Sequence, residues 1–294
     1  MIKRLRYAFE GAAVSALFAL FRLMPLPLAS FVGGTVAGAL GPLLPVHARA
    51  HKNLTRAMPE LSAAEVKRTL GEMWRNLGRV VGEYPHLRKF RAYAPGGRIE
   101  VVGKEHLEAV KNLPGGALLF TGHIGNWETS GLPLIQFGIP IAFVYRAPNN
   151  PYVDRLICRA RGEGITQNAI AKGATGAREM VRQIKKGGYT AMLVDQKMND
   201  GIAVPFFGRD AMTAPALAQL AFKYDLPVWP VRTERLGGCR FRVTIYPELE
   251  LARSGDSARD IAEAMTRVNQ MLEGWIRERP GQWLWLHNRW PKDS

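Results

Sequence analysis

The sequence predicts an α/β fold: a mixed, mostly parallel sheet flanked by helices, preceded by an apolar helical segment that anchors the chain to a membrane. Two observations predict it. From about residue 50 onward, short apolar runs alternate with amphipathic segments, the pattern of strands joined by crossover helices. The 24 residues from Leu23 to Val46 carry no charge at all. We therefore divide the chain into an anchor, residues 1–46, and a single α/β domain, residues 47–294.

The anchor begins with basic residues and is interrupted by prolines. The prolines limit its regular apolar part to residues 28–41, which is shorter than the roughly 20 residues of a simple spanning helix. Gly34 and Gly38 have the small-xxx-small spacing that lets helices pack closely. We favour a monotopic or hairpin anchor over a single spanning helix. A cleaved signal peptide and a soluble pair of apolar helices are further alternatives.

Overall composition restricts the class of protein. Hydrophobic residues make up 47% of the chain, which excludes a disordered chain and a polytopic membrane protein. The net charge of +15 favours anionic partners such as nucleic acid, anionic lipid or an acidic carrier. Two cysteines, Cys158 and Cys239, cannot build a disulfide framework, and without a CxxC pair no structural zinc site is expected.

Signals in the first half of the domain define its elements. Ser62 and Glu65 form a capping box at the start of a helix over residues 62–79. The continuous apolar run ALLFT at 117–121 is typical of a strand buried on both faces. Asn150 followed by Pro151 marks the start of a helix. Further strands are expected at 98–103 and 140–146, and helices at 126–137 and 151–161.

The second half repeats the alternation. Thr175 is expected to cap a helix that ends at Gly187 and Gly188. Thr213 is expected to start another helix that runs to about residue 224. Strands are predicted at 189–194, 227–232 and 240–246, and a long helix at 257–277.

The most informative stretch for chemistry is LLFTGHIGNWETSG, because a loop follows a buried strand there. His123 lies in this loop, at the carboxyl end of the strand, where open α/β sheets bind ligands. Glu128 follows five residues later, and we expect its carboxylate to fold back toward the imidazole. That contact would raise the basicity of the free ring nitrogen, so that His123 could take a proton from a hydroxyl. The same spacing also arises by chance in capping or surface pairs.

The stretch TGHIGNWE resembles the His-x4-Asp/Glu motif of glycerolipid acyltransferases, and its flanks resemble the bacterial lipid A late acyltransferases in particular. The resemblance covers roughly residues 10–290 and is specific in combination. Five further blocks carry it: HKNLTRAMPELS at 51–62, YRAPNNPYVDRLICRARG at 145–162, VDQ at 194–196, VPFFGRDAMT at 204–213 and WLWLHNRW at 283–290.

The resemblance implies a reaction and a set of site residues. The reaction is transfer of a fatty acyl chain from an acyl carrier protein thioester to a hydroxyl of an anionic lipid A precursor, at the cytoplasmic face of a bacterial inner membrane. His123 and Glu128 would form the catalytic dyad, and Arg161 and Asp195 would contact substrate. Arg146 and Asn126 complete the expected substrate-binding residues. No metal and no cofactor other than the thioester co-substrate are expected.

Two features of the residues bear on this reaction. No GxSxG elbow is present, so direct transfer is favoured over a covalent acyl-enzyme. On the predicted helix 151–161, Val153, Ile157 and Arg161 share one face, whereas Arg155 and Arg159 lie on another.

Other functions remain open at this stage. The acceptor could be another glycolipid or phospholipid, such as a phosphoinositol mannoside. The Ile-Gly-Asn-Trp stretch between His123 and Glu128 departs from the bulkier pattern of other members, which leaves the choice of acyl chain open. A lipid hydrolase or thioesterase could use the same pair of residues on water. A basic nucleic-acid-binding module fits the charge, but no recognised binding motif is present and the apolar N-terminus argues against it.

Overall fold

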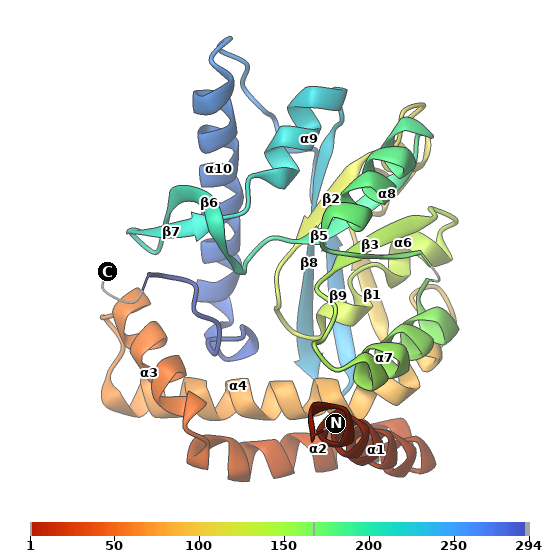
Figure 1. Cartoon of the computed structure of the whole chain (residues 1–294), viewed down its shortest axis with the longest axis vertical. Coiled ribbons are helices and arrows are strands. Elements are labelled where there is room, and N and C mark those ends of the chain that lie inside the picture. Colours follow the sequence, from red (N-terminus) through yellow and green to blue (C-terminus); the bar gives the residue numbers. More distant parts are fainter. Residues whose placement is uncertain (1, 167, 292–294) are drawn as a thin grey trace.

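The computed structural model describes residues 2–166 and 168–291, and it shows a seven-stranded sheet between helices (Figure 1). Its strands are β1 (Ile99–Val102), β2 (Leu118–Thr121), β3 (Ile141–Tyr145), β4 (Ala169–Ala171), β5 (Tyr189–Leu193), β8 (Val228–Gly237) and β9 (Arg240–Ile245). The strand order is β1–β9–β8–β2–β5–β3–β4, and every neighbouring pair is parallel except β8 and β9. The predicted mixed, mostly parallel sheet is confirmed.

Helices pack on both faces of this sheet. One face carries α5 (Lys104–Lys111), α6 (Leu132–Gln136), α7 (Pro151–Gly164) and the 3-10 helix η2 (Tyr84–Lys89), and the other carries α8 (Ala174–Lys185), α9 (Ala216–Tyr224) and α10 (Ser257–Glu278). Strand β2 divides its side chains between the two faces. Leu118 and Phe120 belong to the core under α10, and Ala117 and Leu119 to the opposite core. The ALLFT run is therefore buried on both faces, as predicted.

The N-terminal helices lie along the underside of the molecule in Figure 1. They are α1 (Ile2–Leu23), α2 (Leu26–Leu40), the 3-10 turn η1 (Gly41–Leu43) and α3 (Val46–Ala57). Helix α2 packs closely on α4 (Ala63–Glu83): a Cβ on Gly33 would lie 2.3 Å from the carbonyl oxygen of Gly78. Gly34 and Gly38, the predicted close-packing pair, also face α4, under its arginine side chains. The division at residue 46 stays a prediction, but these helices are packed on the α/β unit.

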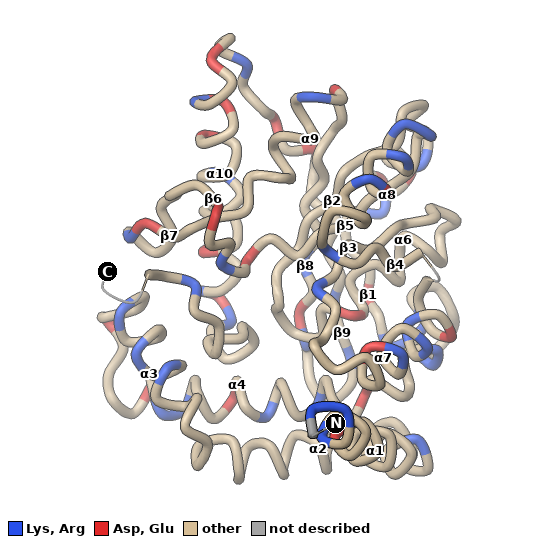
Figure 2. The backbone as a smooth tube through the Cα atoms, viewed as in Figure 1, with Lys and Arg blue, Asp and Glu red and all other residues tan. Residues whose placement is uncertain are grey.

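The outer faces of α1 and α2 expose large apolar side chains. The stretch Leu26–Leu43 is long and apolar enough to cross a membrane, and 33% of it is buried inside the protein. Figure 2 shows that α2 carries no charged residue, whereas α3 carries several. Among the residues whose exposure the structure describes, eleven of the sixteen exposed large hydrophobic ones fall within the first 46 positions: Leu5, Phe9, Leu17, Leu20, Leu23, Leu28, Phe31, Val36, Leu40, Leu43 and Leu44.

Several predicted helix starts are confirmed. The Ser62 hydroxyl accepts from the backbone nitrogen of Glu65, and the Glu65 carboxylate accepts from the backbone nitrogen of Ser62, so the capping box is complete. Asn150 caps α7 by accepting from the backbone nitrogens of Tyr152 and Val153.

Three predicted helix boundaries are wrong. The helix expected over 126–137 is a 3-10 turn, η3 (Trp127–Thr129), followed by the short α6, because Pro133 lacks the backbone N–H that a continuous helix needs. Gly173 rather than Thr175 precedes α8, so Thr175 lies inside its first turn. Thr213 ends a strand instead of starting α9.

The hairpin of β6 (Lys197–Phe206) and β7 (Arg209–Thr213) was not predicted. Its turn requires Phe207 to adopt a positive φ of 52°, which large side chains rarely do. The backbone nitrogen of Phe207 donates to Glu273 of α10 at 2.6 Å. The hairpin, which directly follows Asp195 and Gln196 on the chain, is thus fixed to the long helix α10.

Candidate active site

The predicted site residues converge at the carboxyl ends of the central strands. Thr121 at the end of β2 pairs in parallel register with Leu193 at the end of β5. The loops after these two strands therefore bring His123 beside Asp195, although 72 residues separate them. The loop is also clamped from the C-terminal segment, because Ile124 forms a β-bridge with Trp283.

His123 is held by Asp195 through two contacts. The backbone nitrogen of His123 donates to Oδ2 of Asp195 at 2.7 Å, and the imidazole Nδ1 lies 2.7 Å from Oδ1. Trp283 Nε1 adds a third bond, to Oδ2, at 2.8 Å. Burial alone would raise the pKa of the Asp195 carboxyl, but the facing His123 and its hydrogen bonds lower that pKa. Asp195 is therefore an ionised, fully buried carboxylate that orients the imidazole.

The other side of the imidazole faces polar groups at the edge of the site. The side-chain nitrogen of Gln196 lies 3.2 Å from His123 Nε2 and 3.4 Å from His287 Nε2. With Nδ1 donating to Asp195, Nε2 of His123 carries the lone pair and accepts from the amide. His123 keeps 8% of its surface exposed, whereas Asp195 keeps none. The nitrogen that could accept a proton is thus the one that the buried carboxylate does not bind.

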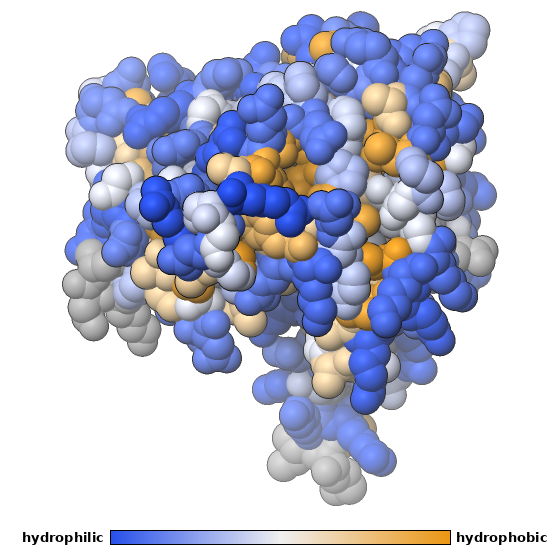
Figure 3. All heavy atoms as spheres, turned by 90° about the horizontal axis from the view of Figure 1, so that it is seen from above, coloured by the Kyte–Doolittle hydropathy of each residue, from blue (hydrophilic) through white to orange (hydrophobic). Residues whose placement is uncertain are grey.

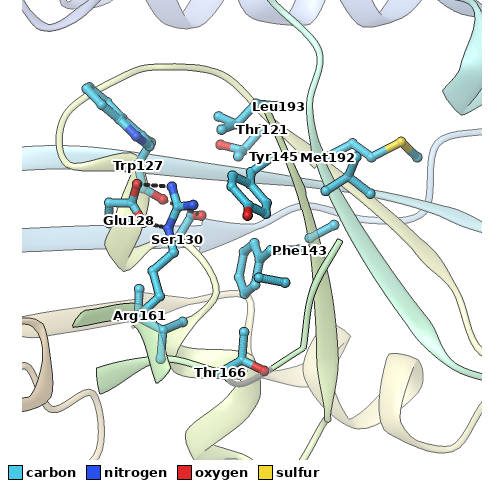
Figure 4. Close-up of a pocket in the computed structure, with 14 residues that line it drawn as sticks. Thr121, Trp127, Glu128, Ser130, Phe143, Tyr145, Arg161, Thr166, Met192 and Leu193 are labelled. Carbon is cyan, nitrogen blue, oxygen red and sulfur yellow. Dashed lines mark hydrogen bonds and ion pairs between the residues drawn. The ribbon is translucent and has the colours of Figure 1, made fainter. Parts of the chain in front are cut away.

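Glu128 does not fold back on the imidazole as expected, because it is engaged by Arg161. Nε of Arg161 donates to Oε2 of Glu128 at 2.8 Å and Nη2 donates to Oε1 at 2.6 Å, a bidentate pair between η3 and α7 (Figure 4). Burial alone would lower the pKa of Arg161, but Glu128 raises it. The carboxylate partner of His123 is Asp195, and Glu128 is the partner of Arg161.

Arg161 keeps one donor that the pair with Glu128 does not use. Its Nη1 atom is buried and has no hydrogen-bond partner among the described residues. The guanidinium lies over the Tyr145 ring, 5.2 Å from its centroid, beside a pocket of about 30 Å³ that Phe143 and Leu193 also line (Figure 4). Arg161 points toward the strand ends, whereas Arg159, which was predicted on another face of the helix, pairs with Glu163 at the surface.

Asn126 holds the loop from inside. Its side-chain nitrogen donates to Glu83 at 2.8 Å, and its oxygen accepts from the backbone nitrogen of Glu128 at 3.2 Å. Asn126 has no exposed surface, so its predicted contact with substrate has no accessible atom in this structure. Glu83 in turn is bound by Arg235 and by Ser30 of α2. A buried network thus connects the N-terminal helices to the position of Glu128.

Arg146 is the remaining predicted residue. It is exposed directly after β3, at the same edge of the sheet as His123. Sequence reasoning did not single out Gln196, His287 or Trp283 as members of the site. The available signal was their position in the VDQ and WLWLHNRW blocks, which the fold brings to His123.

An apolar cavity of about 270 Å³ opens between the strand ends and helices α8 and α9. Leu193 and Val194 line it and precede Asp195 on the chain, so the cavity begins next to the His123 centre. Seen from the top of Figure 1, apolar residues gather in the middle of a face with a hydrophilic rim (Figure 3). The other side chains that narrow the cavity include Ile170, Ala177, Met180, Met198, Ala216 and Leu217.

A metal centre finds no support in the described residues. Within residues 2–166 and 168–291, no three His, Cys, Asp or Glu side chains gather as metal ligands.

Comparison with known proteins identifies the family. Residues 2–292 match the family described as bacterial lipid A biosynthesis acyltransferase. The chain is 26% identical to a lipid A biosynthesis acyltransferase of Haemophilus influenzae, over 81% of this chain and 73% of that protein. It is 26% identical to a lipid A biosynthesis palmitoleoyltransferase of Escherichia coli (90% and 86%), and 23% identical to a phosphatidylinositol mannoside acyltransferase of Mycolicibacterium smegmatis (82% and 89%). The chain is an acyltransferase and belongs to the bacterial lipid A biosynthesis acyltransferase family.

Proposed function

We propose that the protein transfers a fatty acyl chain from a thioester directly to a hydroxyl of a lipid A precursor, with His123 as the general base. One observation carries this proposal: the His123 imidazole is bound at Nδ1 by the buried Asp195 carboxylate and presents Nε2 at the accessible edge of the sheet. An imidazole oriented in this way is suited to accept the proton of an attacking hydroxyl.

The step balances with these groups alone. The hydroxyl oxygen attacks the thioester carbonyl carbon while its proton passes to Nε2 of His123, and Asp195 stabilises the imidazolium. The tetrahedral intermediate expels the thiolate, which takes the proton back from Nε2. One ester and one thiol form, and the proposal requires neither a metal nor a redox cofactor.

Arg161 would bind an anionic or carbonyl oxygen of the substrate through its unused Nη1 donor. Glu128 would then serve the reaction by fixing the guanidinium, since the bidentate pair holds its plane. Arg146, exposed at the same edge, would add positive charge for the phosphates of an anionic acceptor.

The apolar cavity between the strand ends and α8 and α9 would hold the acyl chain. Its lining is mostly apolar, with Lys172 as a charged member, and it includes Val194, the residue before Asp195 on the chain. Burying the chain in this cavity removes hydrocarbon from water and places the carbonyl at the base.

The donor would be the thioester of an acyl carrier protein. Such a carrier is acidic, and the net charge of +15 favours it over a neutral partner. Helix α3 supplies a cationic surface beside the site: Asn53 of α3 donates to the backbone oxygen of His287, and Arg49, Lys52 and Arg56 are exposed on the same helix.

The enzyme would bind the cytoplasmic face of the inner membrane as a monotopic protein. Helix α2 fits this arrangement better than a spanning one, because Ser30 donates to Glu83 and Gly33 contacts the α4 backbone. A spanning α2 would have to give up both contacts. Replacing Phe31 and Leu40 by aspartate should weaken binding to phospholipid vesicles, whereas Val102→Asp, at an exposed apolar residue on β1, should not. Equal binding of both variants would contradict this anchor.

A second acceptor class has a specific observation in its favour. The Mycolicibacterium smegmatis relative is named for a phosphatidylinositol mannoside, and the alignment covers 82% of this chain. One assay separates the candidates: the full-length enzyme is incubated in EDTA with acyl carrier thioesters and each acceptor, and the lipids are analysed by mass. The proposal predicts an acylated lipid A precursor. Acylated phosphatidylinositol mannoside alone, free fatty acid alone, or activity lost in EDTA and restored by a divalent ion would each contradict it.

A further inference from the structure

We propose that Gln196 is a catalytic residue whose side-chain amide donates a hydrogen bond to the oxyanion formed on the thioester carbonyl, and that His287 is the positioning residue that aims this amide. The inference rests on the acyl transfer proposed above. It adds the group that stabilises the negative charge, which neither His123 nor Asp195 can do.

Gln196 lies beside the proposed base, between β5 and β6. It directly follows Asp195, the carboxylate that binds His123, and directly precedes Lys197 at the start of β6. Its amide nitrogen lies between two imidazoles, 3.2 Å from Nε2 of His123 and 3.4 Å from Nε2 of His287. The centroids of the His123 and His287 rings lie 5.1 Å apart, with an angle of 65° between the ring planes.

The protonation of the two imidazoles determines which end of the Gln196 amide can face them. Nδ1 of His123 donates to Asp195, which leaves the lone pair on Nε2. Burial, His123 and Arg289 lower the pKa of His287 to about 4, although Asp195 opposes the shift, so His287 is neutral at neutral pH. The amide nitrogen of Gln196 faces both rings. Its two hydrogens fit two acceptors, Nε2 of His123 and, in the tautomer that carries its proton on Nδ1, Nε2 of His287.

The arrival of substrate changes this arrangement in a defined way. The acceptor hydroxyl needs Nε2 of His123 and therefore replaces one hydrogen bond of Gln196. The other N–H remains bound to His287 and keeps the amide in place. The released N–H lies beside the base, within reach of the carbonyl under attack. A donor held there before the reaction stabilises the oxyanion at no cost of reorganisation.

The test is steady-state kinetics of the full-length enzyme with a lauroyl thioester of acyl carrier protein and detergent-dispersed lipid A precursor. Loss of one oxyanion donor typically lowers kcat about 10²- to 10³-fold, and we expect this for Gln196→Ala, with KM for both substrates nearly unchanged. Asn199→Asp is the matched control, because Asn199 is an exposed amide on the neighbouring stretch of β6. It should keep wild-type kcat.

Two further variants separate a donor from a structural residue. Gln196→Glu keeps the size of the side chain but sets a carboxylate where negative charge develops, so this variant should turn over more slowly than Gln196→Ala. If Gln196 only filled space, Gln196→Glu would turn over faster than Gln196→Ala. His287→Ala should lower kcat less than Gln196→Ala, and the double variant should match Gln196→Ala alone, because His287 acts through the amide.

Three outcomes would overturn the inference: wild-type kcat in Gln196→Ala, a raised KM for the acceptor with unchanged kcat, or Gln196→Glu faster than Gln196→Ala. Thermal melting of each variant ensures that rates are compared between folded proteins. Failure of the wild-type enzyme to transfer the acyl chain would instead refute the proposed function. The two failures are therefore distinguishable.

Discussion

Two buried charged centres lie on either side of the loop after β2, and they differ in a way that identifies the chemical one. Around Glu83, both carboxylate oxygens accept hydrogen bonds, from Ser30, Asn126 and Arg235, and no part of Glu83 is exposed. Around Asp195 the carboxylate is equally buried, but its partner His123 presents a ring nitrogen at the accessible edge. Burial and charge alone therefore do not mark a catalytic group. In the function proposed above, the distinguishing feature is the ring nitrogen of His123 that the buried carboxylate leaves unbound.

Removing the His123 imidazole should have the largest effect on the reaction and tests this difference between the two centres most strongly. We expect His123→Ala to lower kcat about 10²- to 10⁴-fold, the usual contribution of a general base, with little change in melting temperature. The measurement is turnover and thermal melting of purified protein. His51→Ala, at an exposed histidine on α3, is the control and should behave as wild type. Near-normal turnover of a folded His123→Ala variant would refute the assignment.

The Glu83 centre should respond in stability rather than in chemistry. Glu83→Ala leaves Arg235 buried without its carboxylate, which should destabilise the fold by about 3–5 kcal/mol. Denaturant unfolding measures this loss. Glu60→Ala breaks the exposed ion pair with Arg277 and should cost under about 1 kcal/mol. Equal stability of the two variants would mean that the buried network does not hold the loop.

Arg161 combines features of His123 and Glu83: it is paired with a carboxylate, that of Glu128, but it keeps one donor that this pair does not use. We expect Arg161→Ala to lower kcat/KM roughly 10- to 100-fold, the range for losing a hydrogen bond to a charged group. Arg161→Lys should recover only part of it, since lysine lacks the planar fork. Arg155→Ala and Arg159→Ala on the outer face of α7 should be nearly silent. Small and equal losses of kcat/KM in all four arginine variants would mean that α7 contributes only diffuse positive charge.

A substitution in the apolar cavity should change the rate least of all and should instead change the product. Ala177 lines it from α8, and Ala177→Phe should shorten the preferred acyl chain while leaving turnover with shorter donors close to that of wild type. Mass analysis of the product from a mixture of carrier thioesters measures the chain length. Ala37→Phe, in the apolar groove between α2 and α4, adds the same side chain elsewhere and should not alter chain choice. An unchanged profile in Ala177→Phe would place the acyl chain outside this cavity.

The sequence was sufficient for the sheet but not for the pairing of charges in the site. Continuous apolar runs such as ALLFT and the cap at Asn150 predict strands and helices because these signals are local. No local sequence signal, by contrast, shows which strands are neighbours in the sheet. The partnership of His123 with Asp195 depends on β2 lying beside β5, and from spacing alone Glu128 was the nearer carboxylate. The β6–β7 hairpin was missed because its turn places Phe207 at positive φ, where Asn, Asp or Gly is usual, and Gly208 alone did not mark the turn.

The most direct test of the account is the dependence of kcat/KM on pH in two variants measured together, Asp195→Asn and Glu128→Gln. If Asp195 is the anion that stabilises the protonated imidazole, its loss should lower the rate and move the acid limb of the profile to lower pH, because protonation becomes less favourable. Glu128→Gln should lower the rate and leave the acid limb where it is in the wild type, because Glu128 acts on Arg161. A limb that moves in Glu128→Gln and stays in place in Asp195→Asn would contradict the account.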